Sequence, residues 1–159
     1  MNEIFNATLQ ERLKSLCENE LFVYQPTGSM VKANVVRTQL SCKPGGYQEG
    51  SEYPLVRWAI FSGKQAKQGI SQMAVVVEAA IWTPGKEQDG SSDIERLISA
   101  LLGIVRNRNF GEYRLVTPVD FTIGGQRDDE EGLQPHPYYQ GKIYLNFIAG
   151  GSGSGPQCR

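Results

Sequence analysis

The stretch from Ser91 to Arg108 carries the clearest helical pattern in this chain of 159 residues. Its apolar side chains recur at intervals of three and four, which places them on one face of an α-helix: Ile94, Leu97, Ile98, Leu101 and Val105. A helix of roughly 17 residues is about 25 Å long, which is enough to cover one side of a small sheet. Because the flanking segments have strand patterns, we expect this helix to cross the face of a sheet.

Both ends of this helix are marked in the sequence. Ser92 and Glu95 have the spacing of a capping box, in which each side chain accepts a hydrogen bond from the other residue's backbone N–H. Arg106 and Arg108 lie at the C-terminal end, where the helix dipole favours positive charge. We therefore predict a helix from Ser92 to Arg108. Three residues offer the left-handed conformation that stops a helix: Asn107, Asn109 and Gly111.

The other elements follow from shorter patterns. Residues 3–18 predict a second helix with one apolar side: Phe5, Leu9, Leu13 and Leu16. Segments rich in β-branched and aromatic residues predict strands: 21–24, 31–40, 53–61, 73–82, 113–123 and 140–148. Residues 63–69 carry four Lys and Gln side chains and are expected to form an exposed turn. Residues 134–139 are expected to be a stiff lead-in to the last strand.

The segment 73–82 is the strongest of the predicted strands. Alternate residues are apolar on both of its faces, which is typical of a central strand covered on both sides. Within 113–123, Pro118 interrupts the pattern and is tolerated at an edge or a bulge. The order of helix, strands, helix and strand pair predicts the α+β class. We expect an antiparallel or mixed sheet of four to six strands packed with two main helices.

The length and composition indicate one globular domain. Residues 1–149 are predicted to form it, and residues 150–159 to be a flexible Gly/Ser-rich tail. The net charge of −1 argues against a general nucleic-acid binder, whose surface is basic. No apolar run approaches the length of a membrane span. Three widely spaced cysteines without a CxxC pair predict free thiols: Cys17, Cys42 and Cys158.

Residues that could carry chemistry are few. The single histidine, His136, stands between two prolines and has no marked nucleophile or second ligand near it. Gly124-Gly125 lacks the spacing and the lysine of a phosphate loop. The acidic run Asp128-Asp129-Glu130-Glu131 lacks the spacing of a calcium loop and is predicted to be solvated, or to line a channel that carries DNA. We therefore assign no catalytic, cofactor or metal residue, and expect a non-enzymatic domain.

Charged and aromatic residues suggest contact surfaces instead. The end of the long helix and the strand that follows place Arg106, Arg108 and Arg114 close together in sequence, and we predict that they contact a neighbouring subunit. Tyr138 and Tyr139 flank a loop and are further candidates for anchoring a partner.

Several short motifs follow one another between Tyr53 and Phe147, each occurring once. A long strand ends in Ile81-Trp82, the helix ends in Arg106-Asn107-Arg108, and Gln134-Pro135-His136-Pro137-Tyr138-Tyr139 leads into the last strand. In this order the second half of the chain resembles a family of small tail proteins of long-tailed bacteriophages, of the tail terminator or tail completion type.

The resemblance implies a structural protein of the virion, assembled in the cytoplasm of the host bacterium. Proteins of this family form a ring, usually hexameric, at the head-proximal end of the tail tube. The implied partners are other copies of the chain, the tail tube protein and neck or connector proteins, with double-stranded DNA passing through the lumen without specific binding. A closed ring needs a heterologous contact, in which one patch meets a different patch on the neighbour.

Two segments depart from the family pattern. Residues 31–52 are longer than the usual connection, and the tail at 150–159 has no counterpart, so either segment is an arm that orders on assembly or a disordered loop. The alternatives to a terminator are a head–tail connector or head completion protein and, in another class, a small cytoplasmic ligand-binding domain or enzyme.

Overall fold

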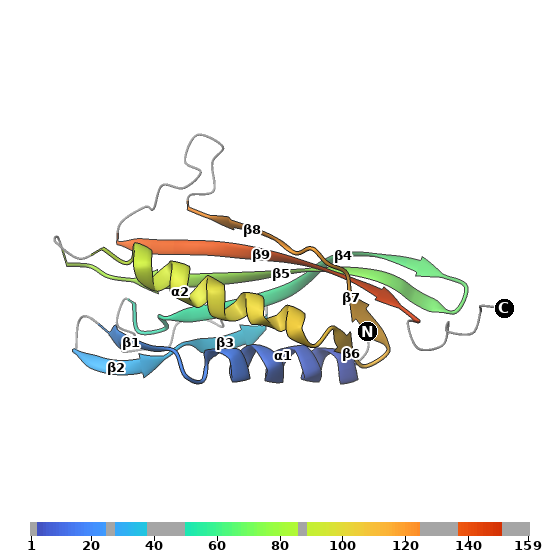
Figure 1. The fold of residues 1–159 in the computed structure, drawn as a ribbon, viewed down its shortest axis with the longest axis horizontal. Helices are drawn as coiled ribbons and strands as arrows, with labels where there is room; N and C mark the ends of the chain where they lie inside the picture. The colour runs from blue at the N-terminus through green and yellow to red at the C-terminus, as the bar shows by residue number, and fades with distance from the viewer. Residues whose placement is uncertain (1–2, 25–27, 38–49, 86–88, 125–136, 151–159) are drawn as a thin grey trace, which may run out of the picture.

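The structure is a computed structural model, and it describes residues 3–24, 28–37, 50–85, 89–124 and 137–150. Figure 1 shows two helices lying side by side against one face of an elongated sheet. The helical elements are α1 (Glu3–Cys17), α2 (Ser91–Leu101) and the 3₁₀ helix η1 (Leu102–Arg106). The strands are β1 (Leu21–Tyr24), β2 (Ser29–Lys32), β3 (Asn34–Arg37), β4 (Leu55–Ala66), β5 (Gly69–Trp82), β6 (Asn109–Phe110), β7 (Tyr113–Leu115), β8 (Asp120–Ile123) and β9 (Tyr138–Ala149).

The predicted α+β class with two main helices is confirmed. The main sheet is mixed and has seven strands in the described residues, in the order β3-β4-β5-β9-β7-β6, with β8 also pairing with β9. Among the described strands, the β3–β4 pair alone is parallel, and β1 and β2 form a separate antiparallel pair. The sheet exceeds the expected four to six strands because 113–123 divides into β7 and β8 around Pro118, and β6 adds a short edge.

The long strand β5 lies in the middle of the sheet and packs one face against the helices. Its buried side chains match the predicted inward set: Met73, Val75, Val77, Ala79 and Ile81. The opposite face is only half-buried at Val76, Glu78 and Trp82. The expectation that both faces are covered is wrong for the described chain, because α1 and α2 lie on the same side of the sheet (Figure 1).

Helix α1 is anchored by an aromatic cluster at its start. Phe5 is fully buried, and its ring meets Phe147 of β9 edge to face at 4.8 Å and Tyr113 of β7 at 5.3 Å. Phe110 of β6 completes the cluster. The same face of the helix buries Leu9, Leu13 and Cys17 further along. The predicted amphipathic helix is therefore confirmed, except that Cys17 is buried and the predicted Leu16 only partly so, and it ends one residue earlier than expected.

The second helix differs from its prediction at both ends. Gly90 is its N-cap, so the proposed Ser92 cap is wrong, and the carboxylate of Asp89 accepts the Ser91 N–H at 2.9 Å. At the other end, the α-helix stops at Leu101 and continues as η1. The tighter 3₁₀ turn places Ile104 in the core, three residues after Leu101, where an α-helix would have placed Val105.

The helix also stops in a different way from the expected one. Asn107 is extended, with φ −129°, and Asn109 lies in β6. Gly111 does have a positive φ of 64°, but it forms the turn between β6 and β7. The chain therefore leaves η1 directly into a strand, and the left-handed residue serves the hairpin that follows.

Three strand boundaries also differ from the prediction. The region 31–40 is not one strand, since β2 ends at Lys32 and β3 begins at Asn34. The expected turn at 63–69 is wrong, because β4 runs to Ala66 and β5 starts at Gly69, where φ is 118°. Tyr138 and Tyr139 already belong to β9 rather than to a lead-in.

Candidate assembly surfaces

The far halves of β4 and β5 form a hairpin arm, residues 61–72, that extends beyond the neighbouring strands (Figure 1). Strand β3 pairs with β4 only as far as Trp58, and β9 pairs with β5 only from Gln72 onward. Among the described strands, the outer part of the arm therefore has no third strand. An isolated two-stranded ribbon is marginally stable in water, so this arm is suited to gain contacts from another chain.

The predicted contact residues Arg106, Arg108 and Arg114 come together at the same end of the molecule. They line a cleft of about 630 Å³, which we call the basic cleft, between the end of η1 and the β6–β7 hairpin. All three side chains are exposed. Arg108 donates a hydrogen bond to the Thr117 hydroxyl at 3.2 Å. Glu112 is the acidic residue of the cleft lining, so the lining carries a net positive charge.

Arg12 of α1 supports the floor of the basic cleft. Its guanidinium donates to the Asn107 carbonyl oxygen at 2.7 Å and lies 4.0 Å from the centre of the Phe110 ring. Burial lowers the pKa of Arg12 from its usual value. This residue was not singled out from the sequence, because it lies 95 positions from Asn107 and nothing local marks the contact.

Tyr113 connects the basic cleft to the hairpin arm. Its hydroxyl donates to the Ile70 carbonyl oxygen at 3.4 Å, and its ring is 5% exposed. Burial, with a smaller contribution from Glu112, raises the pKa of this tyrosine, so the hydroxyl remains a donor at neutral pH. A groove of about 570 Å³ runs between the arm and the β6–β7 turn. The arm and the cleft are thus parts of one end of the molecule.

The two predicted tyrosine anchors have different positions. Tyr139 points to the helix side and is 5% exposed, so its ring belongs to the core of this chain. A Cβ added to Gly90 would lie 2.8 Å from that ring, which shows how closely the segment before α2 packs on it. Tyr138 points to the opposite face and is half-buried, with its ring 5.7 Å from that of Tyr53. Of the pair, only Tyr138 offers surface to a partner.

The sheet face away from the helices carries a row of charges across three strands. Glu78 of β5 pairs with Arg57 of β4 at 2.6 Å and lies 4.0 Å from Lys142 of β9. Apolar side chains flank this row, among them Val76 and Tyr144, and they are half-buried. We call this surface the open face. Its paired charges and apolar flanks make a surface that a second protein could cover without leaving Glu78 unpaired.

The open face continues onto the hairpin arm as a shallow groove of about 420 Å³. Val116 and Ile148 line it and are 40% and 39% exposed. Phe61, at the bulge where the arm begins, is 59% exposed. The hydrophobic periodicity of the sequence did not indicate that Phe61, Val116 and Ile148 are exposed. Their exposure depends on where the neighbouring strands end, which the sequence pattern does not show.

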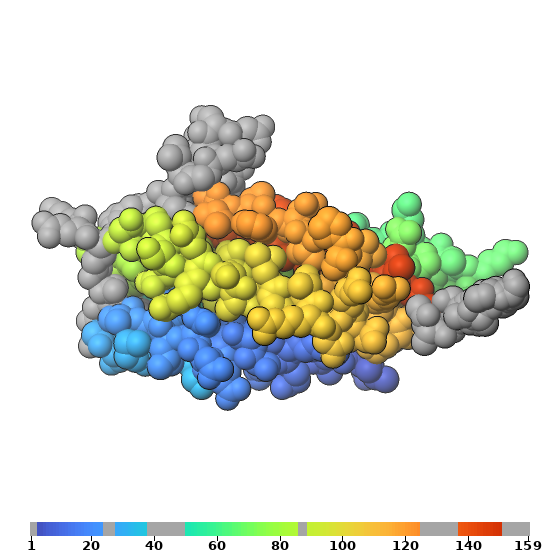
Figure 2. Space-filling model, in the orientation of Figure 1, coloured from blue at the N-terminus to red at the C-terminus, as the bar shows by residue number. Residues whose placement is uncertain are grey.

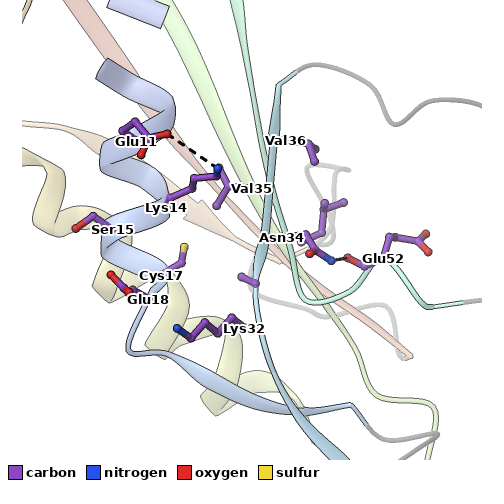
Figure 3. Close-up of a pocket in the computed structure, with 12 residues that line it drawn as sticks. Glu11, Lys14, Ser15, Cys17, Glu18, Lys32, Asn34, Val35, Val36 and Glu52 are labelled. Atoms are coloured by element: carbon purple, nitrogen blue, oxygen red, sulfur yellow. Dashed lines mark hydrogen bonds and ion pairs between the residues drawn. The ribbon is translucent and has the colours of Figure 1, made fainter. Parts of the chain in front are cut away.

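The other notable hollow lies between α1 and β3, with a volume of about 590 Å³ (Figure 3). On the helix side, Lys14 and Glu11 form an ion pair at 4.0 Å. On the strand side, the side-chain amide of Asn34 donates a hydrogen bond to the backbone carbonyl oxygen of Glu52. Burial raises the pKa of Cys17 to about 11, with a further contribution from Glu20. At neutral pH this thiol is protonated, which is a poor state for a nucleophile or a metal ligand.

The opposite end of the molecule is acidic, which the sequence did not reveal. The C-terminal end of α1 contributes Glu18 and Glu20, and the start of α2 contributes Asp89, Asp93 and Glu95. Arg96 joins the two helices by pairing with Glu20 at 3.1 Å and Asp93 at 3.6 Å. These acids come from segments about seventy positions apart in the sequence, so only the antiparallel packing of the helices brings them together.

Several predictions fall outside the described residues. These are the acidic run 128–131, His136, most of the long segment 31–52 and the tail after Gly150. Within the part of the chain that is described, no cluster of three or more His, Cys, Asp or Glu side chains is arranged to hold a metal ion. None of its helices is both long and apolar enough to cross a membrane.

The described residues form a two-layer α+β fold in which they leave one sheet face uncovered and carry opposite charge at the two ends. No protein-family model matches the chain, and a search of curated proteins finds no significant relative. Any assignment of function therefore depends on the surfaces described above and on the resemblance noted in the sequence.

Proposed function

We propose that the chain is a structural subunit of a bacteriophage tail, a terminator that forms a ring at the head-proximal end of the tail tube. The observation that carries the proposal is the hairpin arm, whose outer strands are paired with each other alone in the described chain. A subunit that projects an arm past its own sheet is built to contact a neighbour. The order of strands and helix between Tyr53 and Phe147 that resembles the terminator family includes this arm.

The open face supports the same proposal. A sheet surface that combines apolar residues with an already paired carboxylate suits a protein whose surface is covered by another subunit in the assembled state. The function of such a ring is steric. One face binds the last ring of the tail tube and blocks further addition, and the other face is presented to the neck, with the DNA passing through the centre. The virion is then the site of action, and assembly takes place in the host cytoplasm.

Mass photometry of the purified chain tests the proposal. We expect a closed oligomer, six subunits being the favoured number, formed either alone or with tail tube protein. Adding the ring to polymerising tube protein should stop tube growth, which electron microscopy measures as shorter tubes. A chain that remains monomeric with and without tube protein would refute the proposal. Binding to a head-side connector protein but not to the tube would indicate the connector alternative.

A pair of matched variants tests the role of the arm. Phe61→Ser on the arm should weaken ring formation, because it removes an exposed apolar side chain from the proposed contact. Phe121→Ser on β8 is the control, since Phe121 is 49% exposed against 59% for Phe61 and lies opposite Ile143 of β9, outside the arm. Equal assembly of the two variants would count against a contact through the arm.

A further inference from the structure

The two ends of the molecule carry opposite charge. The basic end comprises the basic cleft and the arm, where the described residues place six cationic side chains against Glu3 and Glu112: Arg12, Arg106, Arg108, Arg114, Lys64 and Lys67. Among the described residues, the acidic end has five carboxylates against Lys14, Lys32 and Arg96: Glu18, Glu20, Asp89, Asp93 and Glu95. Figure 2 shows the elongated molecule with the start of α2 at one end and the arm at the other.

The two ends do not neutralise each other within one chain. From Ser91 to Arg106, α2 and η1 together span roughly 26 Å, at about 1.5 Å per α-helical residue and 2.0 Å per 3₁₀ residue. At physiological salt, exposed charges are screened beyond about 8 Å. Each end therefore presents its own charge to whatever approaches it.

We infer that the basic end of one copy docks on the acidic end of the next, and that this charge-matched contact is the heterologous contact of the ring. The inference rests on the proposed ring-forming function and names the partner surface for its subunits. Pairing two copies through the same end would place arginine against arginine or carboxylate against carboxylate, which costs binding energy. Head-to-tail contact avoids this repulsion, and repeated head-to-tail contacts close into a ring when the rotation allows.

Four side chains are suited to a charge-swap test, because none of them makes a hydrogen bond or ion pair with another described residue. They are Arg106 and Arg114 at the basic end, and Glu18 and Glu95 at the acidic end. All four are exposed, so their replacement leaves the core intact. Arg106→Glu with Arg114→Glu makes a chain with two acidic ends. Glu18→Lys with Glu95→Lys makes a chain with two basic ends.

Each of these two variants alone should require about a hundredfold higher protein concentration to assemble, because every contact then joins like charges. An equimolar mixture of the two should assemble again, since alternating chains restore opposite charges at every contact. Circular dichroism of each variant checks that it remains folded. Asp120→Lys is the control and should assemble like the wild type, because Asp120 is exposed on β8 opposite Tyr144 of β9, away from both ends.

The outcomes separate the inference from the proposed function. If the wild type forms rings and both variants assemble equally well, the charge-matched contact is refuted. It is also refuted if the two variants fail to assemble when mixed. In both cases the proposed ring-forming function is retained. A wild-type chain that stays monomeric at low salt and with tube protein overturns both. Assembly of the wild type that weakens with added salt, together with rescue in the mixture, is the expected result.

Discussion

Replacing Phe5 with alanine should destabilise the fold more than any other single change in α1. Phe5 is fully buried and touches rings from three different strands, at centroid distances of 4.8 to 6.3 Å. Truncating a buried phenylalanine to alanine costs about 3–5 kcal/mol, through lost transfer free energy and the cavity left behind. The two edge-to-face contacts place this site in the upper half of that range, since each aromatic pair adds about 0.5–1.5 kcal/mol.

Urea unfolding followed by circular dichroism measures this loss. For a chain of this size, about 4 kcal/mol corresponds to a fall in Tm of roughly 8–16 °C. Wild type and variant must be compared at one low protein concentration, because assembly adds binding free energy to the apparent stability. Ile4→Ala is the matched control. Ile4 is the preceding residue and is 68% exposed, so its loss should change stability by less than about 0.5 kcal/mol.

A loss of less than about 1.5 kcal/mol for Phe5→Ala, with an unchanged denaturant slope, would contradict this expectation. That result would mean that α1 is not anchored through the aromatic cluster, and that the cluster closes over the gap without loss. A cost equal to that of Ile4→Ala would lead to the same conclusion.

Two smaller perturbations are also informative. Gly141→Ala should lower the free energy of unfolding by about 1–3 kcal/mol, because the new Cβ would lie 2.9 Å from Ile98 Cδ1 and overpack the core. Adding Ile98→Val to the same chain should recover part of this loss, as measured by urea unfolding. Because the pKa of Cys17 is raised from 9.0 to about 11 on folding, the folded state holds this proton more tightly, so its stabilising contribution is complete below pH 9 and is lost as pH rises to about 11. A pH series of unfolding free energies checks this, and the decline attributable to the thiol should be absent in Cys17→Ala.

The sequence predicted those features that depend on local periodicity. The buried faces of α1 and β5 follow directly from the spacing of their apolar residues, and the last strand buries Ile143, Leu145 and Phe147 as its alternation indicated. The class α+β follows from the order of these elements. Element ends were less predictable, because they depend on packing. The switch from α2 to η1 fits Ile104 into the core beside α1, and no local signal marks that requirement.

The basic cleft and the acidic end are formed by residues that lie far apart in the sequence, and most of their contacts could not be predicted. The clustering of Arg106, Arg108 and Arg114 was predictable, since these residues lie within nine positions of one another. The contribution of Arg12 and the joining of the cleft to the arm through Tyr113 were not, because each depends on long-range packing. The acidic end was missed for the same reason. Its carboxylates are unremarkable in sequence and become a patch only when α1 and α2 pack antiparallel.

The outward face of β5 was expected to be covered within the chain, and its composition bears on the proposed function. Its outward residues, with Val76 among them, are as apolar as a strand covered on both sides requires, yet the described chain covers one side. The one acid in this row, Glu78, is already paired with Arg57 and lies near Lys142. Covering the open face would then bury apolar area without stranding a carboxylate, whose unpaired burial would cost several kcal/mol. A sequence that satisfies this condition on a face that the described residues leave uncovered agrees with the proposed role as a subunit of an assembly.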